Sequence, residues 1–177
     1  MRHRTARVVA LLVLVSLGVG LIVGVLWALI APRPELVASS GHLVDAVAYP
    51  QAYIAADAWL GLLCAAAGLV VAVLGLVRWH SSNPDAVLVG LGLGGIIGSI
   101  VAWRVGLGIG GGPVALPADG VTIAGPLELR SYGVLLFWPT WVAIVGLAIG
   151  VSRRGRRRRE DAALDVGAMP AEPVEQS

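Results

Sequence analysis

Glu35, Asp57 and Arg104 are ionisable side chains that lie beside or within the ends of the long apolar runs of this chain. Charged groups at such positions are costly to hold beside hydrocarbon, and in membrane proteins they often mark binding sites or ion pathways. Asp57 and Arg104 lie at similar depth on neighbouring antiparallel runs, so an ion pair between them is geometrically feasible. With Glu35 they predict a small polar site at one membrane face, suited to a lipid headgroup or an anionic substrate.

The same charges also have a purely structural interpretation. Asp57 falls at the start of one predicted helix and Arg104 near the end of another. The helix dipole favours an acidic group at the first position and a basic group at the second, by about 0.3–1 kcal/mol each. Glu128 and Arg130, which precede the last apolar run, are flanking charges of the same kind. The sequence is compatible with both interpretations.

Other chemistries find little support among the residues. The three histidines lie in separate segments and Cys64 is the single cysteine, so we expect no metal site, no intramolecular disulfide and no cofactor. No phosphate-binding loop and no grouping of nucleophile, base and acid is recognisable, which predicts a non-enzymatic protein. The arginines flank apolar runs without an interleaved aromatic surface, which argues against nucleic-acid binding.

The elements that must position these residues are four apolar runs, at about 8–31, 54–79, 84–106 and 131–152. At about 1.5 Å per residue, each is long enough for a helix to cross a hydrocarbon core of roughly 30 Å. The chain of 177 residues is 57% hydrophobic and 14% charged, which is too apolar for an ordinary soluble domain. We therefore predict an all-α membrane protein in which residues 1–152 form a bundle of four transmembrane helices.

Two short extracytoplasmic segments, 32–56 and 107–130, join the runs on one side of the predicted bundle. Both contain two short strand-like stretches around a turn, which is the form of a β-hairpin. The stretches are 35–38 and 42–47 in the first segment, and 114–116 and 121–124 in the second. The remaining residues 153–177 are basic and then acidic without apolar periodicity, so we predict a disordered cytoplasmic tail.

Arginine placement predicts the orientation. All thirteen basic residues are arginine, and all except Arg33, Arg104 and Arg130 fall on one side of the threaded chain. Short loops rich in arginine stay in the cytoplasm, so we expect a multi-pass plasma-membrane protein with both termini cytoplasmic. The cluster after the fourth run is also predicted to contact anionic lipid, at about 1 kcal/mol per arginine near the surface. Its members are Arg153, Arg154, Arg156, Arg157, Arg158 and Arg159.

Glycines at four-residue spacing predict where helices approach one another. They are Gly20 and Gly24 in the first run, and Gly90, Gly94 and Gly98 in the third. In lipid, helices associate largely through close approach at small residues. These glycines predict either packing within the bundle or an interface between copies of the chain. The six tryptophans lie near the ends of the runs, and we expect them in the interfacial belts of the bilayer.

The chain as a whole resembles the uncharacterised small four-span membrane proteins of actinobacterial cell envelopes. The resemblance covers residues 8–152 and is carried by the stretches 27–35, 53–57, 101–106 and 132–139. It implies a cell-envelope location and no specific activity. We expect a non-enzymatic accessory or scaffold protein whose partners are the lipid bilayer and a membrane protein or a second copy. The alternative is a transport component, either a permease-like subunit or a small lipid or solute carrier.

Overall fold

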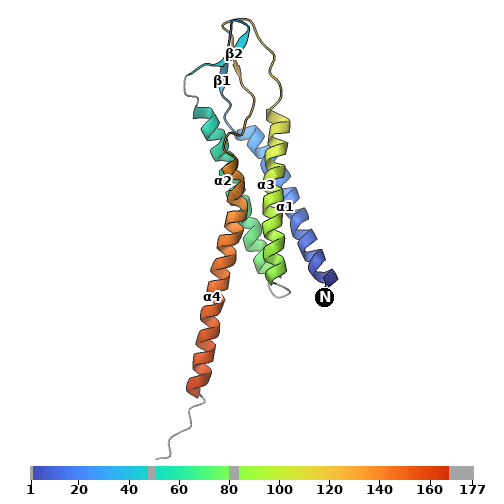
Figure 1. Ribbon diagram of the computed structural model, residues 1–177, viewed down its shortest axis with the longest axis vertical. Helices are drawn as coiled ribbons and strands as arrows, with labels where there is room; N and C mark the ends of the chain where they lie inside the picture. The colour runs from blue at the N-terminus through green and yellow to red at the C-terminus, as the bar shows by residue number, and fades with distance from the viewer. Residues whose placement is uncertain (1, 48–50, 80–83, 168–177) are drawn as a thin grey trace, which may run out of the picture.

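The computed structural model describes residues 2–47, 51–79 and 84–167. Four long helices carry a small sheet at one end of the molecule (Figure 1). The elements in chain order are α1 (Arg2–Ile30), β1 (Glu35–Ser39), β2 (His42–Asp45), α2 (Gln51–Trp79), α3 (Pro84–Gly110), β3 (Thr122–Ala124), the 3-10 helix η1 (Tyr132–Leu136) and α4 (Phe137–Gly167).

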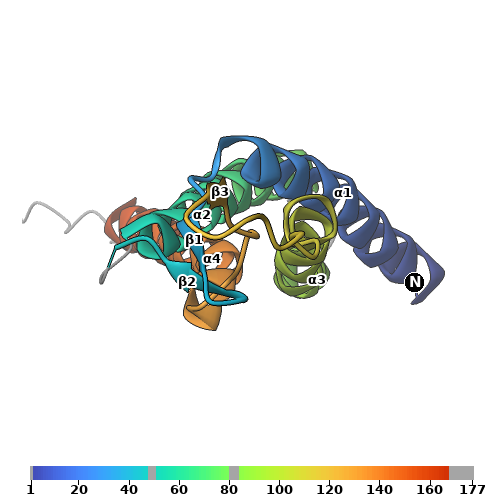
Figure 2. The same ribbon diagram turned by 90° about the horizontal axis from the view of Figure 1, so that it is seen from above.

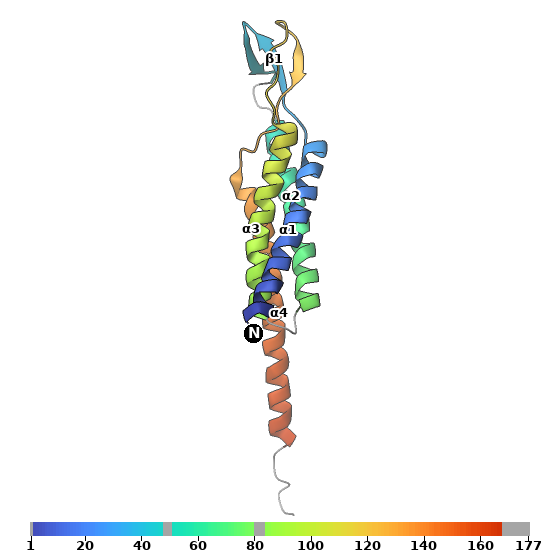
Figure 3. The ribbon, with the colours of Figure 1, turned by 90° about the vertical axis from the view of Figure 1, so that its right-hand side faces the viewer.

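The described chain is mostly helical, as predicted, and it contains four helical segments that are long and apolar enough to cross a membrane, the last of which includes η1 and the first part of α4. These segments are Thr5–Ile30, Gln51–Arg78, Ala86–Gly110 and Tyr132–Ser152. The helices alternate in direction, so the start of α1 and the far end of α4 lie at the end opposite the sheet (Figures 1 and 3). Seen from above, α3 lies against α1, while α4 lies beside α2 (Figure 2).

The predicted hairpin of the first outer segment is present. β1 pairs antiparallel with β2, with Ser39 opposite His42. The two turn residues between them, Ser40 and Gly41, have φ angles of 50° and 78°. Two successive positive φ values are typical of the type I′ turn, whose twist matches that of the flanking strands.

The predicted second hairpin is wrong. Among the described residues, 114–116 form no strand, and β3 pairs with β1 instead, with Leu36 opposite Ile123. The result is one three-stranded sheet of order β2-β1-β3. Residues 114–116 lie between Pro113 and Pro117, and proline cannot donate a ladder hydrogen bond. The free edge of β1 can accept a strand from the second segment, so both outer segments join into one unit.

Close backbone approach joins α1 to α3, and the five glycines singled out above lie between these helices. A Cβ atom at Gly24 would lie 2.5 Å from the carbonyl oxygen of Ala102, and one at Gly94 would lie 2.5 Å from Oγ of Ser16. Gly20 faces the backbone of Gly98 even more closely, and a Cβ at Gly90 would lie 3.1 Å from a methyl carbon of Leu12. Their spacing therefore serves packing within the bundle.

Two of the six tryptophans lie in the core of the bundle and not on its surface. Trp27 and Trp138 are both fully buried. A Cβ at Gly68 or Gly95 would lie within 3.0 Å of the Trp138 ring, and Gly106 leaves room for the ring of Trp27. The indole N–H of Trp27 donates a 2.8 Å hydrogen bond to the carbonyl oxygen of Ala56. These glycines admit large rings into the bundle, which helical spacing alone does not reveal.

The tail also differs from the sequence-based prediction. Residues 153–167, predicted to be disordered, continue α4 as a single helix that projects beyond the bundle (Figure 3). This stretch contains six arginines and two alanines, which have high helix propensity, and it contains no proline. Residues 168–177 of the predicted tail lie outside the described part of the chain.

Gly20→Ala should destabilise the bundle, because its Cβ would meet the backbone carbonyl of Gly98 and α1 would have to move away from α3. Overpacking of this kind typically costs about 1–3 kcal/mol. The matched control is Gly18→Ala, since a Cβ at Gly18 meets no atom within 4 Å. The measurement is unfolding in mixed micelles followed by circular dichroism. Equal midpoints for the two variants would contradict the assigned α1–α3 contact.

Candidate functional site

The three residues predicted to form a polar site do not come together. Asp57 is buried, with 7% of its surface exposed. Arg104 is exposed on α3, and Glu35 is exposed at the start of β1. Among the described side chains, Asp57 and Arg104 form no ion pair. The three residues therefore lie in different surroundings and do not form the predicted site.

Asp57 caps the start of the last helical segment. One carboxylate oxygen accepts a 2.7 Å hydrogen bond from the backbone N–H of Ser131, and the other accepts a 3.2 Å bond from that of Arg130. Ser131 precedes η1 and makes no side-chain capping bond of its own. The first N–H groups of a helix lack partners within the helix, and a carboxylate there also complements the helix dipole. A residue of α2 thus supplies the cap from 74 positions away in sequence.

Arg104 lies against an aromatic pair. Its guanidinium carbon is 4.7 Å from the centre of the Trp103 ring. Trp103 in turn meets the ring of Tyr132 edge-on, with centroids 5.5 Å apart. Because α3 continues to Gly110, Arg104 lies further from the helix end than the sequence predicted. A cation over a tryptophan face is stabilised by about 0.5–1 kcal/mol at an exposed site, so Trp103 offers Arg104 a favourable neighbour.

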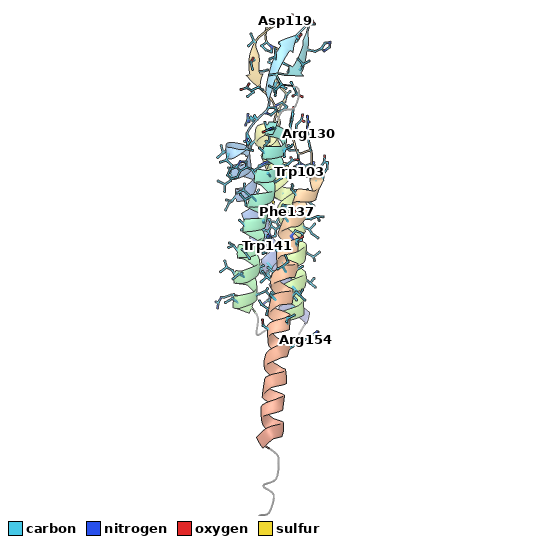
Figure 4. The ribbon with its side chains drawn as sticks, turned by 90° about the vertical axis from the view of Figure 1, so that its left-hand side faces the viewer. Trp103, Asp119, Arg130, Phe137, Trp141 and Arg154 are labelled. Atoms are coloured by element: carbon cyan, nitrogen blue, oxygen red, sulfur yellow. The ribbon has the colours of Figure 1, made fainter. Side chains whose placement is uncertain are left out.

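A polar cluster that the sequence analysis did not assemble lies where the sheet meets the helices. We call Asp45, Tyr53, Glu128 and Arg130 the junction cluster. The Tyr53 hydroxyl donates a 3.1 Å hydrogen bond to Oδ1 of Asp45. The guanidinium of Arg130 lies over the Tyr53 ring, 3.3 Å from its centre, and its Nε is 3.8 Å from Oε2 of Glu128. The cluster joins the end of β2, the start of α2 and the segment before η1 (Figure 4).

One sequence signal could have located part of this cluster. Tyr53 precedes Asp57 by four residues, so both side chains lie on one face of α2. That face meets the segment before η1 at two adjacent points, because Asp57 binds the backbone of Arg130 while Tyr53 binds its side chain. The position of Asp45 depends on the path of the hairpin, which local spacing does not determine.

A groove of about 410 Å³ opens beside the junction cluster. Asp45, Tyr53 and Glu128 supply its polar wall. Leu36 and Leu43 of the hairpin and the loop 111–114 supply the apolar wall. Two carboxylates beside apolar side chains suit a partner segment that carries a basic residue next to apolar ones.

Groups able to hold a metal ion are absent from the described residues, which contain no cluster of three or more His, Cys, Asp or Glu side chains. Cys64 is buried in the core as a free thiol.

The arginines predicted to contact lipid follow the fourth span. The structure describes the side chain of Arg154, which is exposed at the end remote from the sheet (Figure 4). The side chains of Arg153 and Arg156–159 lie outside the described part.

Replacing Asp57 should loosen the start of η1. Asp57→Asn keeps one acceptor oxygen and Asp57→Ala keeps none, so stability should fall in the order wild type, Asn, Ala. A hydrogen bond to a charged group contributes about 1.5–3 kcal/mol. Hydrogen exchange by mass spectrometry should show faster exchange of the peptide containing the amides of Arg130 and Ser131. Asp119→Asn, in the exposed turn at the tip of the sheet, is the control and should leave that exchange unchanged. Unchanged exchange in Asp57→Ala would contradict the cap.

Comparison with known proteins adds no relative from which a function could be carried over. No protein-family model matches the chain, and no curated protein and no solved structure is significantly similar to it. Function has to be inferred from the residues and contacts described above.

Proposed function

We propose that this protein is a non-enzymatic scaffold of the cell envelope that presents its small sheet to a partner protein. One observation carries the proposal: the ionisable groups near the sheet are engaged in fastening the sheet to the helices. Both oxygens of Asp57 bind backbone N–H groups, and Tyr53 lies against the Arg130 guanidinium and donates a hydrogen bond to Asp45. Such contacts hold an outer surface in a defined position, which is what a scaffold requires.

The groove beside the junction cluster is the proposed docking surface. Its carboxylates, Asp45 and Glu128, favour a partner segment with a basic side chain, and its leucines favour apolar neighbours. Glu128 is half exposed, since 50% of its side-chain surface is accessible. Its ion pair with Arg130 is therefore worth little, and its carboxylate can turn to a partner at small cost.

The proposed location is the plasma membrane, with both termini in the cytoplasm and the sheet outside. The support is the arginine distribution, because the arginine-rich end is opposite the sheet. The four-span envelope proteins that the chain resembles would share this location. The transport alternative draws on Asp57 and Arg104 as a joint site, and it receives less support because these two side chains lie in separate surroundings.

The orientation can be tested by labelling single cysteines. Cys64 is buried in the core, so its thiol should not react with maleimides. Ser40→Cys, in the exposed hairpin turn, should react with a membrane-impermeant maleimide on intact cells. Gly155→Cys, on the exposed projecting part of α4, should react only after the membrane is opened. Labelling of Gly155→Cys on intact cells would contradict the proposed orientation.

The scaffold function can be tested by photocrosslinking in living cells. A photoreactive amino acid at Val114, in the wall of the groove, should capture a defined protein partner. Glu128→Arg should reduce that capture at least fivefold, because it places a positive charge where a basic partner segment is expected. Asp119→Arg makes the same charge change at the tip of the sheet, away from the groove, and should leave capture unchanged (Figure 4).

The level of each variant in the membrane must equal that of the wild type for the comparison to hold. Equal capture by wild type and Glu128→Arg would contradict docking at the groove. If Val114 captured no protein in cells, the scaffold proposal itself would be wrong. If instead Arg104→Gln abolished movement of a solute or lipid at unchanged protein level, the transport alternative would be favoured.

A further inference from the structure

A second groove runs along α4 beside Leu88 of α3, towards the end of the bundle opposite the sheet. It has a volume of about 480 Å³, which is within the range of about 300–1,000 Å³ common for ligand sites. Leu88 of α3 and, among others, Val142, Leu147 and Gly150 of α4 line it, and Arg154 lies at its end. All of these except Arg154 belong to the membrane-spanning segments. The groove is therefore apolar along its length and basic at one end.

The groove exists because α4 packs loosely over this part of its length. Only 11% of the most apolar window of its span is buried, against 28–50% for the other three. A Cβ atom at Gly150 would meet no other atom within 4 Å. The neighbouring walls are open, since Leu147 and Val151 are 70% and 61% exposed. No described side chain of the protein fills the space.

We propose that this groove binds one acyl chain of an anionic phospholipid, with Arg154 holding the lipid phosphate. The apolar wall ends at Val151 and the span at Ser152, so Arg154 lies at the level where a lipid headgroup begins. A guanidinium forms strong charge-assisted hydrogen bonds with phosphate. Further arginines flank Arg154 in the sequence, at positions 153 and 156–159, and they add attraction for an anionic membrane surface.

The positive charge of the arginine cluster favours an anionic lipid, and not a second copy of the chain, as the occupant of the groove. Two copies in the same membrane orientation that met through this face of α4 would bring two arginine clusters side by side. Charges closer than about 8 Å repel with little screening at physiological ionic strength. An anionic lipid at the same place would neutralise the cluster. A zwitterionic lipid would fill the groove equally well but leave the arginines without net compensation.

The inference does not depend on the scaffold proposal, because the groove and the docking surface lie at opposite ends of the bundle. It can be tested on the full chain in nanodiscs of phosphatidylcholine that contain a small fraction of phosphatidylglycerol. After mild extraction, the lipids retained per protein are counted by quantitative mass spectrometry. The wild type should retain phosphatidylglycerol well above its fraction in the nanodisc.

Two variants separate the two parts of the site. Arg154→Gln removes the charge and leaves the groove open, so the preference for phosphatidylglycerol should fall about fivefold. Gly150→Leu fills the groove without meeting any protein atom near its Cβ, so retention of both lipids should fall several-fold. The matched controls are Arg78→Gln, another exposed arginine of a span end, and Gly155→Leu, which lies beyond the groove with open space around its Cβ. Both controls should behave like the wild type.

A lipid with a photoreactive group in its acyl chain gives a second, independent readout. It should label peptides that contain Leu88 or Leu147 in the wild type, and this labelling should fall in Gly150→Leu. If Arg154→Gln and Arg78→Gln lowered retention equally and Gly150→Leu had no effect, the arginines alone would attract lipid and the groove proposal would be wrong. It would also be wrong if Gly150→Leu dissociated a dimer while leaving the retained lipid unchanged, because the face would then join two copies.

Discussion

Close approach of α1 and α3 is the constraint on which the rest of the structure depends. Lipid tails are as apolar as the helices themselves, so helices gain little from simple apolar burial and rely on intimate contact. At Gly20, Gly24 and Gly98 that contact is between backbones. Once α1 and α3 are joined, Gly95 and Gly98 present a hollow that accepts the ring of Trp138 from α4. The same ring also lies against Gly68 of α2, so α2 and α3 together position α4.

Two buried polar groups near the sheet-bearing end find hydrogen-bond partners, which lowers the cost of burying them. Trp27 binds the carbonyl oxygen of Ala56, and Asp57 binds the backbone before η1. These neighbouring positions on α2 therefore tie it to α1 on one side and to the last helical segment on the other. β1 follows α1, and β3 precedes the segment that leads to η1, so the placement of the sheet depends on the packing of the helices.

The packing of α4 changes along its length, so the two ends of the bundle offer different surfaces. Near its start, the helix is held by Trp138 within the bundle. Further along, the atoms nearest to a Cβ placed at Gly146 belong to the side chain of Leu88, and a Cβ at Gly150 would meet no atom within 4 Å. One end of the bundle is therefore tightly built and carries an ordered sheet, while the other end leaves an apolar groove beside arginines. A protein partner at the first end and a lipid at the second would each meet the surface chemistry that suits them.

Local sequence was sufficient for the helices and for the first hairpin, because apolar run length and a two-residue turn with Gly41 act over a few residues. It also located the glycines of the α1–α3 contact, because small residues at four-residue spacing fall on one helix face. Tertiary structure alone decided the pairing of β3 with β1, the burial of Trp27 and Trp138, and the partners of Asp57. Each of these joins residues far apart in the chain, and spacing carries no information about which distant groups will meet. The predicted pair of Asp57 and Arg104 failed for that reason: a buried carboxylate takes the nearest unpaired donors, and folding supplied two backbone N–H groups instead of the guanidinium.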